Sequence, residues 1–283
     1  MGNLFSFLNY NKPGPGVDKE EPEKPKIIVF FQIYLRRFWD LIKVNLLFIF
    51  FNIPALLLVY FLFGVSYNAL QGFFTEGGTL FGFIAFFAFS ALFLCVPVIT
   101  TGPAQAGFTY LLRNFSRQEH AFIMSDFKEH TGKNFKQGFL ISVIDFLILV
   151  FLLADIYISI KSGMNSIIVG LFVCFISLVL ALFLMMHFYI YPMLVTFNLS
   201  LKHIYKNALI FSIVKFFPNL GILFVCFVLS TILFLVLPVL AFVLFPFITV
   251  STIGFITNYY AYPTLEKYMI NREVYIDETN KEV

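Results

Sequence analysis

The chain has 283 residues, of which 60% are hydrophobic and only 12% are charged, and its mean hydropathy is +0.88. Soluble domains contain about 25% charged residues, so this composition excludes an ordinary soluble domain and indicates a membrane protein. The formal net charge of +3 is too small to indicate a nucleic-acid-binding protein.

The N-terminal segment, residues 1–26, is polar and precedes the first apolar stretch. It lacks the basic, apolar and small-residue regions of a cleaved signal peptide. The following residues, 27–43, have polar side chains spaced four, four and three apart, which predicts an amphipathic helix at the membrane surface. Membrane anchoring alone explains such a helix, and a docking surface for a partner is the alternative. The polar positions are Gln32, Arg36, Asp40 and Lys43.

Six apolar stretches are long enough to cross a bilayer as helices. The last two are separated only by Pro238, so a five-span chain in which Pro246 kinks one helix remains the alternative. The predicted spans are Val44–Val65, Leu80–Leu112, Gly138–Ile160, Ser166–Met193, Leu220–Leu237 and Val239–Tyr262.

Basic residues predict the orientation of these spans. With six crossings, 18 of the 19 Lys and Arg residues lie on one side of the membrane, and only Lys161 lies on the other. Positive charge is retained on the cytoplasmic side, so both termini are expected in the cytoplasm. The predicted organisation is a transmembrane domain over residues 27–263 and a cytoplasmic tail over residues 264–283.

An asparagine lies at or just before the start of each of the three predicted outward spans, namely Asn45, Asn134 and Asn219. The intervals of 89 and 85 residues suggest a repeated unit of an interfacial segment, an outward helix and a return helix. The predicted fold class is therefore all-α, with six transmembrane helices as three hairpins and with amphipathic interfacial helices. Chance similarity among six-helix proteins is the alternative to internal homology.

The stretch GPAQAG at residues 102–107 ends the second predicted span. Pro103 lacks a backbone donor and is expected to bend the helix. Small residues four positions apart allow close helix packing. We therefore predict a bent, tightly packed crossing, with a hinge or pore constriction as the alternative. The residues are Gly102, Pro103, Ala106 and Gly107.

The segment between the second and third spans is the most polar loop of the chain. A solvated loop with salt bridges is the simple interpretation, and a contact surface for another subunit is the alternative. The candidate contact residues are Arg113, Asn114, Asp126, Phe127, Asn134, Lys136 and Gln137.

Ionisable residues inside a membrane span are functional candidates. Asp145 lies about two turns into the third span, and His187 lies near the inner end of the fourth. Antiparallel packing of these spans would bring the two side chains within about two turns of each other. A structural hydrogen bond, a proton-coupled site and solvation at the membrane interface are all open. Asp155 points about 80° away from Asp145 on a helix of 3.6 residues per turn.

No enzymatic motif occurs: HExxH, GxSxG, the P-loop and the glycine-rich dinucleotide fingerprint are all missing. Three cysteines occupy separate apolar runs, and the spacing of His120 and His130 matches no compact metal site. We therefore expect no enzyme activity, no cofactor and no metal.

Three blocks resemble the YesL-like family, a bacterial membrane family of unknown function. They are PGPGV at Pro13–Val17, the RRFWDLIKVN run, and GPAQAGFTYLLRNFSRQEHAFIMSDFKEHTGKNFKQ from Gly102 to Gln137. The resemblance implies a multi-pass protein of the bacterial plasma membrane. It also implies an association with carbohydrate ABC importers, but no catalytic or binding residues.

The function expected from these observations is a non-catalytic accessory protein that assembles with or regulates a carbohydrate ABC importer. Its partners would be the lipid bilayer and the permease and ATPase subunits, with no nucleic acid. Two alternatives remain: a small-solute transporter or channel with its own pore, and a lipid-interacting scaffold.

Overall fold

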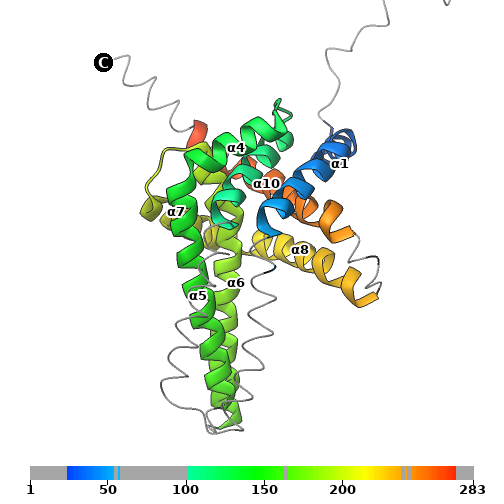
Figure 1. Cartoon of the computed structure of the whole chain (residues 1–283). Helices are drawn as coiled ribbons and strands as arrows, with labels where there is room; N and C mark the ends of the chain where they lie inside the picture. Colours follow the sequence, from blue (N-terminus) through cyan, green and yellow to red (C-terminus); the bar gives the residue numbers. More distant parts are fainter. Residues whose placement is uncertain are drawn as a thin grey trace, which may run out of the picture.

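A computed structural model describes residues 24–53, 57, 101–161, 165–236, 240 and 244–271. Every regular element within these ranges is a helix, which confirms the predicted all-α class (Figure 1). Much of the first predicted span, most of the second and the turn around Pro238 lie outside the described residues. The N-terminal PGPGV block also lies outside them, as does the tail from residue 272 onward.

The third and fourth predicted spans form a long helical hairpin, α5 (Phe135–Lys161) and α6 (Ser166–Thr196) (Figure 1). Their most apolar parts, Phe135–Ile156 and Ser166–Thr196, have mean hydropathies of 2.7 and 3.1, long and apolar enough to cross a membrane. The side-chain oxygen of Asn165 accepts a hydrogen bond from the backbone N–H of Ile167 at 2.9 Å and caps α6.

The fifth predicted span, Leu220–Leu237, lies almost entirely in one helix, which follows a shorter, separate helix. Helix α7 (Leu201–Val214) and helix α8 (Phe216–Val236) are separated at Lys215 and meet at an angle of 96°. The two helices pass the length and hydropathy test of a membrane span only as a bent pair. The described helices therefore provide two candidate spans, or three if the bent pair counts as one.

A helix, a one-residue break and a second helix recur three times. The first pair is α1 (Lys26–Arg36) and residues 38–53, which join at Arg37. The second is α4 (Ile123–Lys133) and α5, which join at Asn134, and the third is α7 and α8. Arg37 and Asn134 both have φ −98° and ψ 11°, and Lys215 has φ −109° and ψ 36°. The order of helix, break and helix agrees with the predicted unit, whose interfacial and outward placement stays a prediction.

The predicted amphipathic helix over residues 27–43 is therefore wrong in one respect, because it is interrupted at Arg37. The guanidinium of Arg37 donates to Asp40 at 3.2 Å and to the backbone carbonyl of Glu119 at 3.4 Å. It also lies 5.1 Å from the ring centre of Phe115. The contacts with Phe115 and Glu119, which are distant in the sequence, stabilise the break, and the local sequence contains no Pro or Gly that would signal it.

Near the C-terminus, a π-helical turn (η2, Phe245–Thr249) leads into α10 (Val250–Leu265), and a second π-helical turn (η3, Glu266–Ile270) follows. Pro246 lies in the first of these turns. A wide turn leaves backbone groups without their usual helical partners. The amide of Asn45 fills this role, because its nitrogen donates to the carbonyls of Phe245 and Pro246 and its oxygen accepts from the N–H of Ser251 at 2.6 Å.

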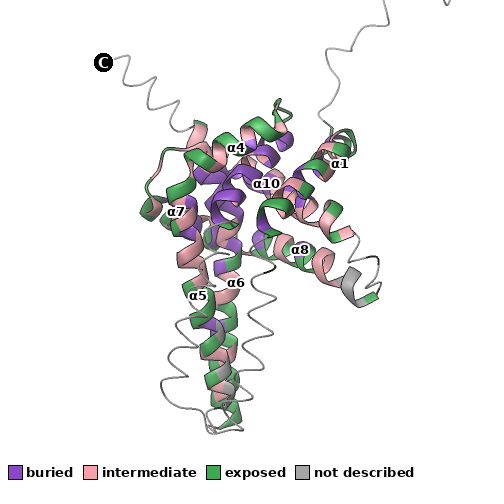
Figure 2. Ribbon diagram, in the orientation of Figure 1, coloured by how far each residue is buried: buried purple, intermediate pink, exposed green. Residues whose placement is uncertain are grey.

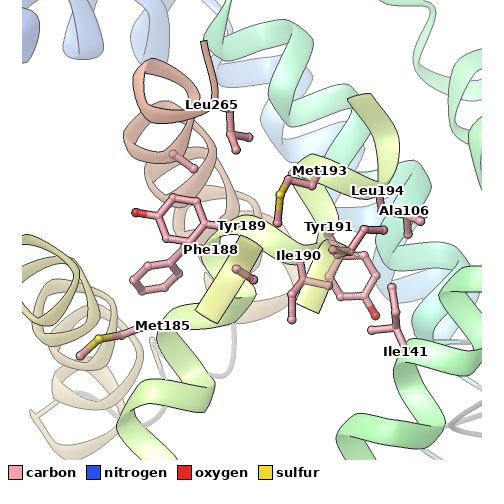
Figure 3. Close-up of a cluster of buried hydrophobic side chains, with 13 residues drawn as sticks. Ala106, Ile141, Met185, Phe188, Tyr189, Ile190, Tyr191, Met193, Leu194 and Leu265 are labelled. Atoms are coloured by element: carbon pink, nitrogen blue, oxygen red, sulfur yellow. The ribbon is translucent and has the colours of Figure 1, made fainter. Parts of the chain in front are cut away.

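Burial is concentrated at one end of the molecule, where α4, α10, α6 and α7 meet, and the far part of the α5–α6 hairpin is mostly exposed (Figure 2). One buried cluster joins α6 and α7 to α10, with Tyr189, Ile190 and Met193 fully enclosed (Figure 3). A second joins α1, the helix formed by residues 101–116, α4 and α10 around Phe108, Phe127 and Phe255. The exposed part of the hairpin is apolar, with Phe151 at 66% and Leu171 at 68% exposure, as expected of a lipid-facing surface.

Candidate functional site

Three polar side chains from three helices meet inside the apolar hairpin. His187 on α6 lies with Nε2 at 2.9 Å from Oδ2 of Asp145 on α5. The hydroxyl of Tyr205 on α7 donates to the other carboxylate oxygen of Asp145 at 3.0 Å. Asp145 and His187 are 20% and 27% exposed, so the group is largely shielded. We call these three residues the Asp145 cluster.

The geometry of the Asp145 cluster defines its proton content. Nδ1 of His187 lies 2.9 Å from the backbone carbonyl oxygen of Phe183, which can only accept, so Nδ1 carries a hydrogen. A second hydrogen must then lie between Nε2 and the Asp145 carboxylate, on one atom or the other. The pair therefore holds one shared proton and has no net charge. Loss of that proton would leave a nitrogen lone pair facing a carboxylate.

A cavity of about 380 Å³ opens beside this cluster. Its wall combines residues of the segment 101–116 with those of α5 and α6, and several polar side chains interrupt a mostly apolar surface. The lining residues are Thr101, Gln105, Ser142, Asp145, Phe146, His187 and Tyr191. A cavity with converging polar groups and an ionisable pair is a reasonable binding-site candidate.

The small residues of the GPAQAG stretch create close helix contacts at the edge of this cavity. A Cβ at Gly102 would overlap Ser142 and the backbone carbonyl of Gly138, so the two glycines allow residues 101–116 and α5 to approach at backbone distance. Gly107 meets α4 in the same way, because a Cβ there would overlap Thr131 and lie 2.6 Å from the Phe127 carbonyl. Pro103 and Ala106 are buried between these contacts. The residues before Thr101 lie outside the described part, and so does any bend at Pro103.

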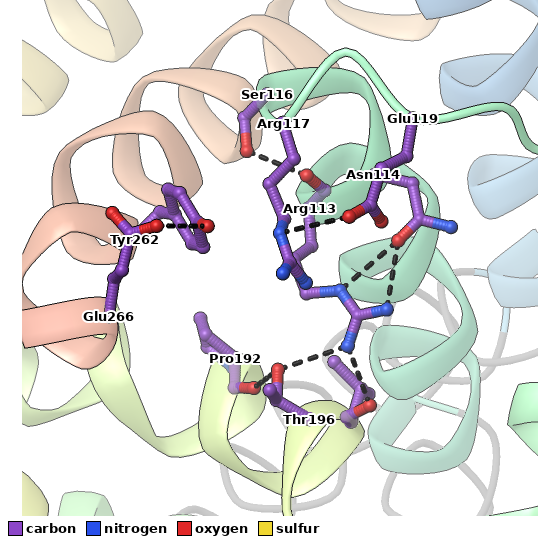
Figure 4. Close-up of polar contacts among 10 residues, drawn as sticks. Arg113, Asn114, Ser116, Arg117, Glu119, Pro192, Thr196, Tyr262 and Glu266 are labelled. Carbon is purple, nitrogen blue, oxygen red and sulfur yellow. Dashed lines mark hydrogen bonds and ion pairs between the residues drawn. The ribbon is translucent and has the colours of Figure 1, made fainter. Parts of the chain in front are cut away.

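Arg113 and Asn114 form internal contacts. The Arg113 guanidinium donates to the carbonyl of Val195 at 2.9 Å and to the Thr196 hydroxyl at 3.0 Å, both at the end of α6 (Figure 4). It also donates to the side-chain oxygen of Asn114 at 2.9 Å and lies 4.6 Å from the ring centre of Tyr110. Asn114 is only 3% exposed, so these two predicted contact residues connect two helices of the molecule.

Helix α4 packs on the membrane helices through one face only. Phe127 is fully buried against the second core cluster, and the ring of His130 stacks on Tyr110 with centroids 3.3 Å apart. Asp126 accepts from the backbone N–H of Phe122 at 2.9 Å and so closes the start of α4. Burial and the nearby charge of Lys133 lower the pKa of His130 below its ordinary value, and Glu129 opposes this shift only in part.

The opposite face of α4 is open. Its apolar and charged side chains follow one another three or four residues apart along the helix, and Lys133 forms an ion pair with Glu129. Lys136 continues it into α5, whereas Asn134 bonds back to the carbonyl of His130 at 2.9 Å and Gln137 donates to the carbonyl of Leu199 at 3.0 Å. We call this face the α4 surface; its exposed residues are Met124, Ser125, Lys128, Glu129, Lys133 and Lys136.

A second polar junction was not predicted. The side-chain oxygen of Asn219 on α8 accepts hydrogen bonds from the hydroxyls of Tyr189 at 2.8 Å and Tyr260 at 2.7 Å. Its nitrogen donates to the carbonyls of Phe211 at 3.1 Å and Ser212 at 3.4 Å, across the break between α7 and α8. Asn219 is fully buried. The sequence shows that these asparagines recur, but it does not show that their side chains hydrogen bond to backbone groups at helix breaks.

Within the described ranges, no group of three or more His, Cys, Asp or Glu side chains is arranged to hold a metal ion.

Residues 41–156 match the model of a family described as a protein of unknown function, DUF624. This region includes residues 101–116, α4 and most of α5, so it contains Asp145 and the α4 surface but not His187 or Tyr205. No curated protein matches the chain significantly. No solved structure does so either.

Proposed function

We propose that this chain is a non-catalytic accessory protein of the bacterial plasma membrane that assembles with, or regulates, a carbohydrate ABC importer. In this proposal the chain crosses the membrane six times as three hairpins, and both termini and the α4 surface face the cytoplasm. The choice of a carbohydrate importer rests on the resemblance to the YesL-like family alone.

The observation that supports an accessory role is the construction of the α4 surface. A short helix is fixed to the transmembrane helices by a buried aromatic residue, a ring stack and a close glycine contact, so its position is well defined. Its free face combines Met124 with charges of both signs. A surface that combines apolar and charged side chains in this way is typical of a non-obligate protein–protein interface.

The orientation of this surface is supported by the convergence of basic residues. Arg36 donates to the Gln118 side chain at 2.8 Å, and Arg117 lies 4.7 Å from the ring centre of Tyr262, near the end of α10. Basic residues that are remote in the chain therefore lie on the same side of the described helices as α4. Such one-sided positive charge is typical of the cytoplasmic face of membrane proteins.

Site-specific photo-crosslinking in native membranes tests this proposal. A photoreactive amino acid replaces Lys128 on the α4 surface, and a matched variant carries it at Phe151, which is 66% exposed on the apolar part of α5. We expect the Lys128 position to yield adducts with the permease or ATPase subunit of an importer and the Phe151 position to yield none with the ATPase. Absence of importer adducts at Lys128, or equal adducts at both positions, would reject the proposal.

The Asp145 cluster and its cavity favour a second candidate, a small-solute transporter. An ionisable pair beside a cavity that several polar side chains line is a feature expected of a proton-coupled transporter. Purified protein in liposomes with an imposed pH gradient would then accumulate a solute, and Asp145→Asn would abolish that accumulation. Wild-type liposomes that remain impermeable to a solute panel would remove this candidate.

A further inference from the structure

A groove of about 740 Å³ lies between α1, α8 and α10, separate from the Asp145 cluster. Its walls are largely aliphatic and aromatic, with Phe30 from α1, Ile222, Val225 and Leu229 from α8, and Ile256 from α10. The three α8 residues are spaced three and four apart, so they form one continuous stripe on that helix. A volume of this size is sufficient for a small amphiphilic molecule.

The groove has two chemically different ends. The hydroxyl of Tyr259 donates to the backbone carbonyl of Lys26 at 2.7 Å, while Tyr34 and Thr252 are hydrogen bonded at 2.8 Å. Helices α1 and α10 are therefore antiparallel along the groove, with Lys26 at the Tyr259 end and Tyr34 at the other. The two pairs are separated by about eight residues, or roughly 12 Å of helix.

A second lysine lies at the Tyr259 end. The Lys215 ammonium donates to the hydroxyl of Thr264 at 2.6 Å, and Thr264 follows Tyr259 by just over one turn of α10. Helix α8 starts beside Lys215 and extends away from it, so its apolar stripe leads from the lysines toward the far end. The described lining residues include no Asp or Glu that would neutralise Lys26 and Lys215.

We propose that this groove binds one anionic phospholipid, with its phosphate between Lys26 and Lys215 and an acyl chain along Ile222, Val225 and Leu229. Two cations at one end of an apolar groove complement an amphiphile with an anionic head, and phospholipids are the abundant amphiphiles around a membrane chain. Basic pockets between transmembrane helices bind lipid head groups in the same way. The lysine side chains can place their methylene groups along the apolar wall and their ammonium groups at the head group. This inference does not depend on the proposed partner of the α4 surface.

The full-length protein in a neutral detergent can be titrated with phosphatidylglycerol or phosphatidylcholine of identical acyl chains, and bound lipid counted by native mass spectrometry. We expect one phosphatidylglycerol to bind more tightly than phosphatidylcholine. The double variant Lys26→Gln, Lys215→Gln should weaken phosphatidylglycerol binding on the order of tenfold to thirtyfold, from about 1 kcal/mol per lysine near an anionic lipid. The control variant Lys202→Gln, Lys206→Gln removes two exposed lysines of α7 and should change it less than threefold.

The acyl chain is tested separately by Val225→Trp, which places a large ring in the stripe and should weaken both lipids. Circular dichroism and the unfolding temperature in detergent identify any variant that fails to fold, and Lys26→Gln alone, at an exposed position, provides a milder replacement. Equal binding of both lipids, or an equal loss in the α7 control, would overturn the proposal. The proposal would also be overturned if inorganic phosphate displaced phosphatidylglycerol while Val225→Trp left its binding unchanged. That result would show a site for an anion without an acyl chain.

Discussion

Nε2 of His187 and Oδ2 of Asp145 are 2.9 Å apart, and the opposite nitrogen of His187 is committed to a backbone carbonyl. One proton is therefore shared between the two side chains, and Tyr205 donates to the remaining carboxylate oxygen. A histidine and an aspartate in neighbouring membrane helices thus form a neutral, hydrogen-bonded unit. Its stability depends on matched donors and acceptors more than on charge.

Asp145→Asn should be tolerated, because an amide can donate to neutral His187 and still accept from Tyr205. We expect the free energy of unfolding to change by less than about 1 kcal/mol. Asp145→Ala leaves the Tyr205 hydroxyl and Nε2 of His187 without a partner and should cost about 1–3 kcal/mol. Thermal unfolding in detergent compares the two variants, and an equally large loss in both would contradict the shared-proton geometry.

Gly102→Ala should disrupt the close crossing of residues 101–116 over α5, because the added methyl group overlaps the Gly138 carbonyl. Overpacking of this kind costs typically 1–3 kcal/mol. Gly132→Ala on α4 is the matched control, since a Cβ there meets no atom within 4 Å, and it should stabilise the helix by up to about 1 kcal/mol. The order of the two unfolding temperatures is the readout, and a neutral Gly102→Ala would show that the two helices do not touch at this point.

Asn219→Leu should destabilise the protein by about 1–3 kcal/mol, because two tyrosine hydroxyls and the carbonyls at the α7–α8 break lose their partner. Asn219→Asp separates the two roles. A carboxylate can accept from both tyrosines but cannot donate to the carbonyls. We therefore expect the free energy of unfolding to fall below that of the wild type in this variant too. A leucine variant as stable as the wild type would argue against this junction.

His130 should make stability depend on pH. Its pKa is lowered in the folded protein, so the unfolded chain binds the proton more readily. Stability is therefore complete above the ordinary histidine pKa of about 6.5 and falls as the pH decreases from there toward the lowered folded value. His130→Phe keeps an aromatic ring on Tyr110 and should reduce this loss between pH 8 and pH 5.5. Parallel pH profiles of the unfolding temperature in both proteins would contradict it.

The elements that could be predicted from the sequence are those with strong, continuous apolar patterns. Helices α5 and α6 were expected within a few residues of their observed ends, and Asp145 and His187 were expected near each other because antiparallel neighbours fix their depth. A helix separate from the fifth span was expected before Asn219, but the break at Lys215 and the angle between α7 and α8 were not, since Lys215 has no helix-breaking neighbour until Pro218.

The parts that could not be predicted depend on contacts between distant segments. Tyr205 joins Asp145 only because α7 folds back against α6, and no local pattern distinguishes it from the other tyrosines. Arg113 and Asn114 are residue types that usually lie on the surface. Here Arg113 instead donates a hydrogen bond to the backbone carbonyl of Val195, at the end of α6. The break at Arg37 likewise depends on residues 115 and 119.

The most direct test determines on which side of the membrane the α4 surface lies. In a variant without native cysteines, single cysteines replace Lys128, Lys161 or Lys267, and intact cells are treated with a membrane-impermeant maleimide. We expect Lys161→Cys to react in intact cells, and Lys128→Cys and Lys267→Cys to react only after the membrane is opened. Reaction of Lys128→Cys or Lys267→Cys from outside intact cells would contradict the proposed topology and, with it, a cytoplasmic role for the α4 surface.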